Sequence, residues 1–440
     1  MMVLWVQVVR RGKVRIWQMT KSITIVAIIL LALSLFGCNQ STAIPSMEIV
    51  YITVGDGVSY AIDSDGNLWA WGNNTSGQIG DGTITIWDET GGTGRPAELI
   101  EYNNRHTPIK IMDSVVSISS GRAHTMAIRT DGSLWGWGDN AFGALGDGTT
   151  ESRLTPTRIM ESVSAVSVGF GHTLAIKDDG SLWAWGQNHS GQLGDGTHTT
   201  HQVNDNNRHR PIKIMDSVTY ISAGFFHSMA ITADGTLWAW GNHSHYQLGN
   251  GWRGNEISFN GQNIQTVPIP IMDSVVSVSA GSDHTMAIGA DGSLWAWGSN
   301  WVGQLGGEAI DGHFYNRTTP MKIMDSVMSV SAGQSHTMAI MADGSLWGWG
   351  GDRGAIGSDD GVVYRYHGGW RRRAQIPVTI MDSVVMVSAG RSHTLALTID
   401  GSVWAWGSNW SGQLGDGTTV QRNFPVKIID GSSDQFDTQP

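Results

Sequence analysis

The stretch HTMAIRTDGSLWGWGDNAFGALGDGT, from His124 to Thr149, is the key to the architecture of this chain. It carries two tryptophans one residue apart, an Asp-Gly pair before them and a glycine-rich tail. Nearly the same residues recur in HTLAIKDDGSLWAWGQNHSGQLGDGT (His172 to Thr197) and in HTLALTIDGSVWAWGSNWSGQLGDGT (His393 to Thr418). A pattern of this length indicates a repeating structural unit rather than one copied site.

The repeat spacing predicts a β-propeller. An Asp-Gly pair precedes each of seven Trp-x-Trp pairs, at steps of 48 to 66 residues. A period near 50 residues with four short strands per unit is typical of propeller blades. In one unit we expect strands at Pro108–Ile111, Val115–Ser119, His124–Ile128 and Ser133–Gly138. Asp131-Gly132 then forms the tight turn of the last hairpin, because glycine adopts positive φ at little cost.

Seven such units predict an all-β, seven-bladed β-propeller with four antiparallel strands per blade, over residues 48–430. The segment Phe424–Asp430 looks like a first strand without a second, and Ile49–Gly55 looks like a second strand without a first. We therefore expect the ring to be closed by pairing the C-terminal strand with the N-terminal repeat, which would leave no free edge. Residues 431–440 form a C-terminal tail.

Composition limits the classes of function. The 440 residues are 40% hydrophobic and 15% charged, which is far from a disordered composition. The formal net charge is −11, and an acidic body repels phosphate, so we expect no nucleic-acid partner. The single cysteine excludes an internal disulfide framework.

The N-terminal segment, residues 1–38, has the pattern of an export signal. A basic residue precedes an apolar run from Ile23 to Phe36, which is shorter than the roughly 20 residues of a spanning helix. The run ends at Cys38 in a sequence that resembles the lipoprotein-type cleavage site, so we expect lipidation there. Residues 39–47 would be a tether, and Met19 is an alternative start. A buried cysteine or an uncleaved anchor helix is the other interpretation.

The repeat Gly-x-x-His-(Ser/Thr)-x-Ala-(Ile/Leu), Asp-Gly, Trp-x-Trp-Gly and Gly-Gln-Leu-Gly resembles that of the regulator of chromosome condensation family over residues 48–430. The resemblance implies seven blades. The chain is also similar to a secreted propeller-type β-lactamase inhibitory protein of that family. This similarity implies an aromatic-rich binding face. The nucleotide exchange of the family's namesake is not expected, because an exported protein would not meet that partner.

Six blades carry a histidine at the same place, where the first blade has Val58. A residue repeated in every blade serves the blade, so we interpret these histidines as structural, each bonded to a turn. Neighbouring blades would also hold them too far apart to share one zinc ion, and we predict no metal and no cofactor. No residues form a catalytic acid–base pair or nucleophile, so we predict no enzymatic activity. The structural histidines are His124, His172, His227, His284, His336 and His393.

Two features interrupt the repeat and suggest a binding face. One is a variable position after Trp-Gly-x-Asn. The other is a set of insertions before the first strand of the next blade. All fall at the same connection, so they should emerge on one face of the ring. Their tryptophan, tyrosine and arginine content is typical of interface hot spots. The candidate binding-face residues are Trp87, Trp252, Trp301, Phe314, Tyr315, Tyr364, Tyr366, Trp370, Arg371, Arg372, Arg373 and Trp410.

The sequence thus predicts a non-catalytic, monomeric protein-binding propeller, exported and anchored to the bacterial cell membrane or envelope by lipid at Cys38. The partner would be an unknown protein or a cell-wall polymer. Two alternatives stay open: a carbohydrate or cell-wall binding module, and an inhibitor of a cell-wall enzyme or β-lactamase. An enzyme is the least supported class.

Overall fold

The computed structural model describes residues 48–88, 98–199, 205–252, 263–307, 315–352, 354–358, 362–366 and 369–431. The predicted signal segment 1–38 with Cys38, the tether 39–47, Phe314 and tail residues 432–440 lie outside these ranges. Within them the chain has no helix suited to crossing a membrane.

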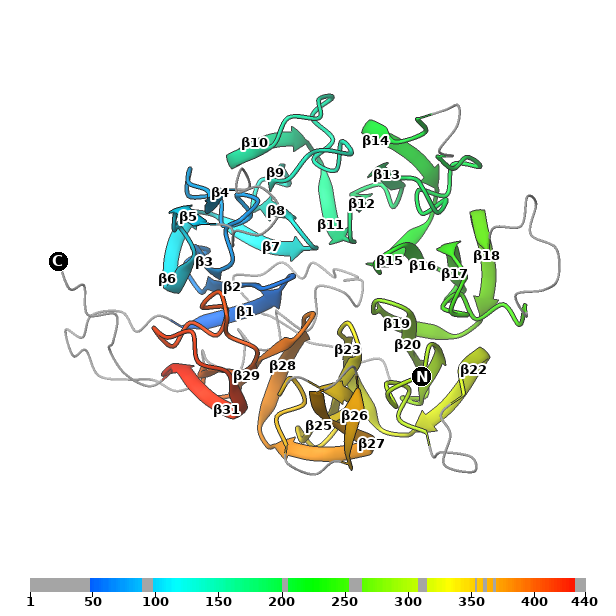
Figure 1. Cartoon of the computed structure of the whole chain (residues 1–440). Helices are drawn as coiled ribbons and strands as arrows, with labels where there is room; N and C mark the ends of the chain where they lie inside the picture. Colours follow the sequence, from blue (N-terminus) through cyan, green and yellow to red (C-terminus); the bar gives the residue numbers. More distant parts are fainter. Residues whose placement is uncertain are drawn as a thin grey trace, which may run out of the picture. The chain divides into compact units, whose positions relative to one another are not determined.

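Seven antiparallel sheets surround a central axis, and each is one blade (Figure 1). The innermost strands are β1 (Ile49–Val54), β7 (Val115–Ser120), β11 (Val163–Val168), β15 (Val218–Ala223), β19 (Val275–Ala280), β23 (Val327–Ala332) and β28 (Val384–Ala389). The second strands are β2 (Val58–Asp63), β8 (His124–Arg129), β12 (His172–Lys177), β16 (His227–Thr232), β20 (His284–Gly289), β24 (His336–Met341) and β29 (His393–Thr398).

The Trp-x-Trp segments form the third strand of each blade. These strands are β3 (Leu68–Gly72), β9 (Leu134–Gly138), β13 (Leu182–Gly186), β17 (Leu237–Asn242), β21 (Leu294–Gly298), β25 (Leu346–Asp352) and β30 (Val403–Gly407). The outermost strands are β6 (Arg105–Met112), β10 (Arg153–Met160), β14 (Arg208–Met215), β18 (Ile264–Met272), β22 (Arg317–Met324), β27 (Gly369–Met381) and β31 (Arg422–Ile429). The predicted all-β, seven-bladed fold with four antiparallel strands per blade is confirmed, and β26 (Val362–Tyr366) adds a fifth strand to blade 6.

The predicted closure of the ring is wrong. The C-terminal strand β31 pairs with β30 of its own blade, and β1 belongs to the sheet β1-β2-β3-β6. Each blade is therefore one continuous segment that ends, rather than begins, with the Pro-Ile-Lys-Ile type of strand. Blades 1 and 2 are linked by the two-residue turn Asp113-Ser114, in which Ser114 adopts a φ of 61°. In the described part of the chain, blade 1 and blade 7 are joined by packing and side-chain contacts and not by strand pairing.

Hydrophobic burial joins each blade to the next. One core cluster combines Ile62, Leu68 and Ala70 of blade 1 with Ala127 and Trp137 of blade 2. The second tryptophan of every Trp-x-Trp pair is fully buried, whereas the side chain of the first is partly exposed. A buried indole contributes a large apolar area, so the blade interfaces hold most of the stabilising apolar contacts.

A repeated hydrogen-bond cluster fixes each junction between blades. Between blades 4 and 5, His227 Nε2 lies 3.2 Å from Thr285 Oγ1. Thr285 donates its hydroxyl hydrogen to the carbonyl of Gln247, which also accepts from Trp297 Nε1 at 2.9 Å. Since the carbonyl can only accept, the imidazole must donate to the hydroxyl. The same histidine-to-hydroxyl pairing joins His124 to Thr173, His172 to Ser228, His284 to Thr337, His336 to Thr394 and His393 to Ser59.

The junction between blades 1 and 2 uses a different residue. Blade 1 has Val58 in place of the histidine, and Tyr60 supplies the missing bond from two residues further along β2. Its hydroxyl lies 2.7 Å from Thr125 Oγ1 and 2.6 Å from the carbonyl oxygen of Gln78. Trp137 Nε1 donates to the same carbonyl. The repeated hydroxyl therefore has a partner at all seven junctions.

The inner strands approach each other most closely at a ring of glycines. A Cβ atom added to Gly121 would lie 1.9 Å from the carbonyl oxygen of Gly169, and one added to Gly169 would lie 2.5 Å from that of Gly224. Any side chain here would push adjacent blades apart, so glycine is required by close approach. The equivalent residues are Gly55, Gly121, Gly169, Gly224, Gly281, Gly333 and Gly390.

Candidate functional site

One face of the ring carries two kinds of connection. Because the four strands of a blade alternate in direction, the loops from first to second strand and from third to fourth strand lie at the same end. The first kind surrounds the axis and the second kind lies further out. An ion pair of 3.5 Å between His245 and Asp283 joins one loop of each kind. We call this end of the ring the loop face.

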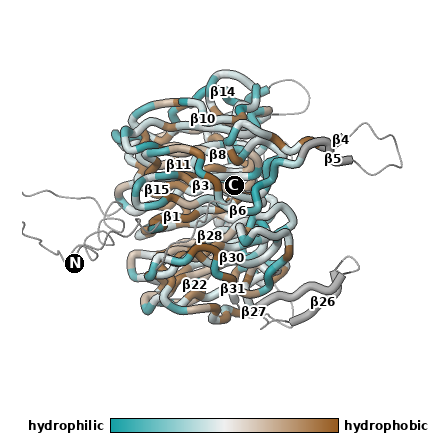
Figure 2. Tube along the Cα trace, turned by 90° about the vertical axis from the view of Figure 1, so that its left-hand side faces the viewer, coloured by the Kyte–Doolittle hydropathy of each residue, from teal (hydrophilic) through white to brown (hydrophobic). Residues whose placement is uncertain are grey.

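The described ends of the predicted insertions lie on the loop face, between the third and fourth strands of one blade. The prediction that they precede the first strand of the next blade is therefore wrong. The insertion of blade 1 contains the hairpin of β4 (Ile86–Asp88) and β5 (Glu98–Glu101). Figure 2 shows β4 extending from one side of the ring.

Several candidate residues belong to the strands of these hairpins. Trp87 is in β4, where it pairs with Leu99. The arginine-rich insertion forms a hairpin in which β26 pairs with the start of β27. The candidate residues in this hairpin are Tyr364, Tyr366, Trp370, Arg371, Arg372 and Arg373.

Four candidate aromatic residues are exposed on loop-face connections, and we call them the aromatic rim. Trp301 is 68% exposed and Trp410 is 74% exposed. Trp252 and Tyr315 are about half exposed and lie between the third and fourth strands of blades 4 and 5, respectively. Trp301 and Trp410 directly follow Trp-Gly-x-Asn in their blades. That position holds Thr75 in blade 1 and Ala141 in blade 2, so the blade itself does not need an indole there.

The loop that carries Trp252 departs from the repeat in its backbone. Tyr246 adopts a φ of 66° at a position where the other blades place glycine. A non-glycine residue with positive φ is uncommon. The His243 ring packs edge-on against Tyr246 and Trp252, with ring centroids 5.9 and 6.4 Å apart. These contacts hold Trp252 in place while leaving about half of it accessible.

A pocket of about 230 Å3 opens where the inner strands end on the loop face. Every blade contributes to it, through the end of its first strand and the glycine of the ring described above. The residue after that glycine is of five different types among the seven blades, so this position varies while the glycine does not. These seven residues are Asp56, Arg122, Phe170, Phe225, Ser282, Gln334 and Arg391.

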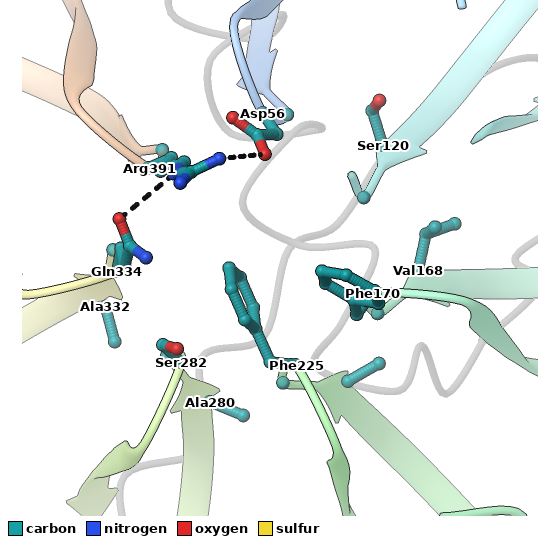
Figure 3. Close-up of a pocket in the computed structure, with 18 of the residues that line it drawn as sticks. Asp56, Ser120, Val168, Phe170, Phe225, Ala280, Ser282, Ala332, Gln334 and Arg391 are labelled. Atoms are coloured by element: carbon teal, nitrogen blue, oxygen red, sulfur yellow. Dashed lines mark hydrogen bonds and ion pairs between the residues drawn. The ribbon is translucent and has the colours of Figure 1, made fainter. Parts of the chain in front are cut away.

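The two halves of this axial pocket differ in chemistry (Figure 3). In one half, Phe170 and Phe225 have ring centroids 5.4 Å apart, and the Arg122 guanidinium lies 4.6 Å from the Phe170 ring. In the other half, Arg391 pairs with Asp56 at 3.0 Å and donates to Gln334 at 3.2 Å. An aromatic wall that also carries Arg122 therefore lies opposite a charged, hydrogen-bonding wall.

Family comparison agrees with this architecture. The family model described as RCC1-like domain matches residues 34–265 and 204–437, which together cover most of the chain. The chain belongs to the RCC1-like domain family. The predicted resemblance to the regulator of chromosome condensation repeat is thus confirmed.

Two relatives and one solved structure place this RCC1-like chain among its family. It is 30% identical over 409 residues to the ultraviolet-B receptor UVR8 of Arabidopsis thaliana, covering 89% of this chain and 85% of UVR8. It is 30% identical to the human E3 ubiquitin-protein ligase HERC2, covering 88% of this chain but only 7% of that protein. The crystal structure of Prp20p from Saccharomyces cerevisiae has a TM-score of 0.67 at 20% identity, over 91% of this chain and 92% of that one.

RCC1-like propellers mediate protein binding or regulation. The six repeated histidines fit such a scaffold role here, since each is buried in a blade junction and bonds a hydroxyl of the next blade rather than the expected turn. Burial lowers the pKa of His124, His172, His284 and His393 to about 3 and that of His227 and His336 to about 4. They are neutral at physiological pH. Among the described residues, no group of three or more His, Cys, Asp or Glu side chains could hold a metal ion.

The axial pocket of this RCC1-like chain was not predicted from the sequence. Its seven variable residues lie between the glycine and the histidine of the repeat, in the first position of Gly-x-x-His. The available signal was the contrast between a constant glycine and a variable neighbour. This contrast is less conspicuous than the insertions, which are longer and richer in aromatic residues.

Proposed function

We propose that this RCC1-like propeller is a non-catalytic module that binds a partner protein through the aromatic rim. The observation that carries the proposal is the exposure of Trp301 and Trp410 at a repeat position that other blades fill with small or polar residues. Exposed indoles on a rigid scaffold are typical of binding hot spots. Prp20p from Saccharomyces cerevisiae binds Gsp1p and histones, which supports protein binding as a use of this fold.

Binding through the rim predicts that Trp301→Ala and Trp410→Ala each weaken retention of the partner by about 2 kcal/mol, or roughly 30-fold. Both changes should leave folding intact within about 0.5 kcal/mol, as for other surface substitutions. The measurement is capture from the native envelope fraction by the immobilised propeller, followed by affinity determination on the captured species.

Ile399→Ala is the matched control. Ile399 is 77% exposed and lies in the turn between β29 and β30, at the end of the ring opposite the loop face. Its change should leave capture unaltered. Equal loss in the control, or full capture by both tryptophan variants, contradicts the proposed face. Capture that survives protease treatment of the envelope fraction would favour a glycan ligand instead.

The proposed setting is an exported membrane surface, to which a lipid on Cys38 would attach the propeller. The support is the position of the only cysteine directly after the apolar run that ends at Phe36. Two acyl chains hold a protein stably on a membrane, whereas one is marginal. Cys38→Ala is expected to move the protein from the membrane fraction to the soluble exported fraction, as measured by fractionation. Retention in membranes at the parent level would contradict lipidation.

A further inference from the structure

The axial pocket is built from side chains that the blades do not require. The same position holds aspartate, arginine, phenylalanine, serine or glutamine in different blades, while the glycine before it is constant. The repeated histidine-to-hydroxyl clusters that join the blades involve other residues. The composition of this ring of seven side chains is therefore free to serve a ligand.

Charge in the pocket differs from charge in the whole chain. The seven variable positions include two arginines and one aspartate, so the pocket is cationic, although the chain has a formal net charge of −11. Asp56 pairs with Arg391, whereas the described contact of Arg122 is the ring of Phe170. A guanidinium beside a ring keeps its donors available to an anion, and such charge-assisted bonds are the stronger kind.

The aromatic half determines the rest of the ligand. Phe170 contacts the rings of both Phe225 and Phe226, at centroid distances of 5.4 and 5.0 Å, with the planes tilted. Figure 3 shows the Phe170 and Phe225 rings directed toward the axis. Tilted rings of this kind favour an aromatic group packed against them. A small, strongly hydrated ion such as phosphate would gain nothing from this wall.

Pocket size points to one ring rather than a large cofactor. The volume of about 230 Å3 lies below the roughly 300–1,000 Å3 of pockets for drug-sized ligands. From charge, walls and size together, we propose that the axial pocket binds an aromatic carboxylate. The ring would pack on Phe170 and Phe225 and the carboxylate would be bound by Arg122, with Arg391 and Gln334 on the opposite wall. The ligand would be either a free aromatic acid or the C-terminal aromatic residue of a polypeptide.

This inference goes beyond the proposed function, because the pocket residues are distinct from the aromatic rim. The probes are N-acetyl-L-phenylalanine, its amide, and an eight-residue peptide ending in phenylalanine with either a free or an amidated C-terminus. Binding is measured by calorimetry on the whole propeller. The free acid should bind, and the amide should bind at least about tenfold more weakly, since the charge-assisted bond is lost.

Variants on both walls test the placement. Arg122→Gln and Phe225→Ala should each weaken the free acid by about tenfold. Asp56→Asn should strengthen it by about three- to tenfold, because the change releases Arg391 and removes a like charge. A gain of affinity cannot result from misfolding. Trp410→Ala should leave acid binding unchanged, which separates this proposal from the rim.

Several results would overturn the proposal. These are equal binding of acid and amide, no binding of the acid up to about 10 mM, or wild-type affinity in Arg122→Gln, Phe225→Ala and Asp56→Asn alike. The peptide pair identifies the source of the ligand. Tighter binding of the free-terminus peptide than of N-acetyl-L-phenylalanine indicates a polypeptide, and weaker binding indicates a free small acid.

Discussion

Acidification from pH 7 to pH 5 is expected to unfold this propeller. Burial lowers the pKa of six histidines to about 3 or 4, whereas an unfolded histidine has a pKa of about 6.5. Between these values the unfolded chain binds protons that the folded chain does not. The histidines therefore stabilise the fold fully above about pH 6.5, and this stability is lost as the pH falls toward 3–4.

Each histidine contributes a slope of up to about 1.4 kcal/mol per pH unit in this window. The slopes of the six histidines add, so the free energy of unfolding should decline steeply as the pH falls. The measurement is the free energy of unfolding in urea at pH 7.5, 6.5, 5.5 and 5.0. The fold lowers the pKa of aspartates such as Asp147 and Asp416, which moves their titration away from this window.

His336→Gln is the matched control for the acid transition. Glutamine keeps a neutral donor for the Thr394 hydroxyl, which His336 contacts at 3.1 Å, but it does not titrate. Unfolding of the variant should take up about one proton fewer, so its free energy of unfolding should depend less steeply on pH. A free energy of unfolding that stays constant from pH 7.5 to 5.5 in the parent protein would contradict the buried, neutral state of the six histidines.

Trp297→Ala should cost about 3–5 kcal/mol of stability, as for other fully buried aromatics. Trp297 is 0% exposed, and its Nε1 donates to the carbonyl of Gln247 in blade 4. Gly249 lies so close to the indole that a Cβ there would be 2.6 Å from Nε1. The truncation thus leaves a cavity between two blades and removes one bond of the junction.

Trp301→Ala is the comparison, because Trp301 is only four residues further along the chain and is 68% exposed. Its effect on the urea midpoint should correspond to no more than about 0.5 kcal/mol. A similar loss in both variants would mean that Trp301 also supports the blade, and the aromatic rim would then lose one of its members.

The strands were predictable from the sequence because each is a local pattern. Trp135 and Trp137 in alternation, with an Asp-Gly turn before them, indicate a hairpin without any knowledge of the neighbours. The grouping of strands into blades was not predictable in the same way. A repeat with four strands has no marked beginning, and the long insertion after Gly72 suggested a boundary that the pairing of Gly72 with Arg105 removes.

Contacts across blade junctions were also beyond local patterns. The sequence shows His227 followed by Ser228, but not that each bonds a different neighbouring blade. The replacement of a histidine by Val58 becomes intelligible only with Tyr60 in place beside Thr125. The axial pocket escaped prediction for a related reason, since its residues are about 50 positions apart in sequence and meet only after the ring has closed.

The continuous blades have a mechanical consequence. Six of the seven junctions have a covalent link as well as packing, but blades 1 and 7 are joined by side-chain and backbone contacts alone, including Ser59 with His393 and Asp56 with Arg391. Tension applied between β1 and β31 would therefore separate the ring first at this seam. The resistance of the whole molecule to pulling would then be that of a single interface.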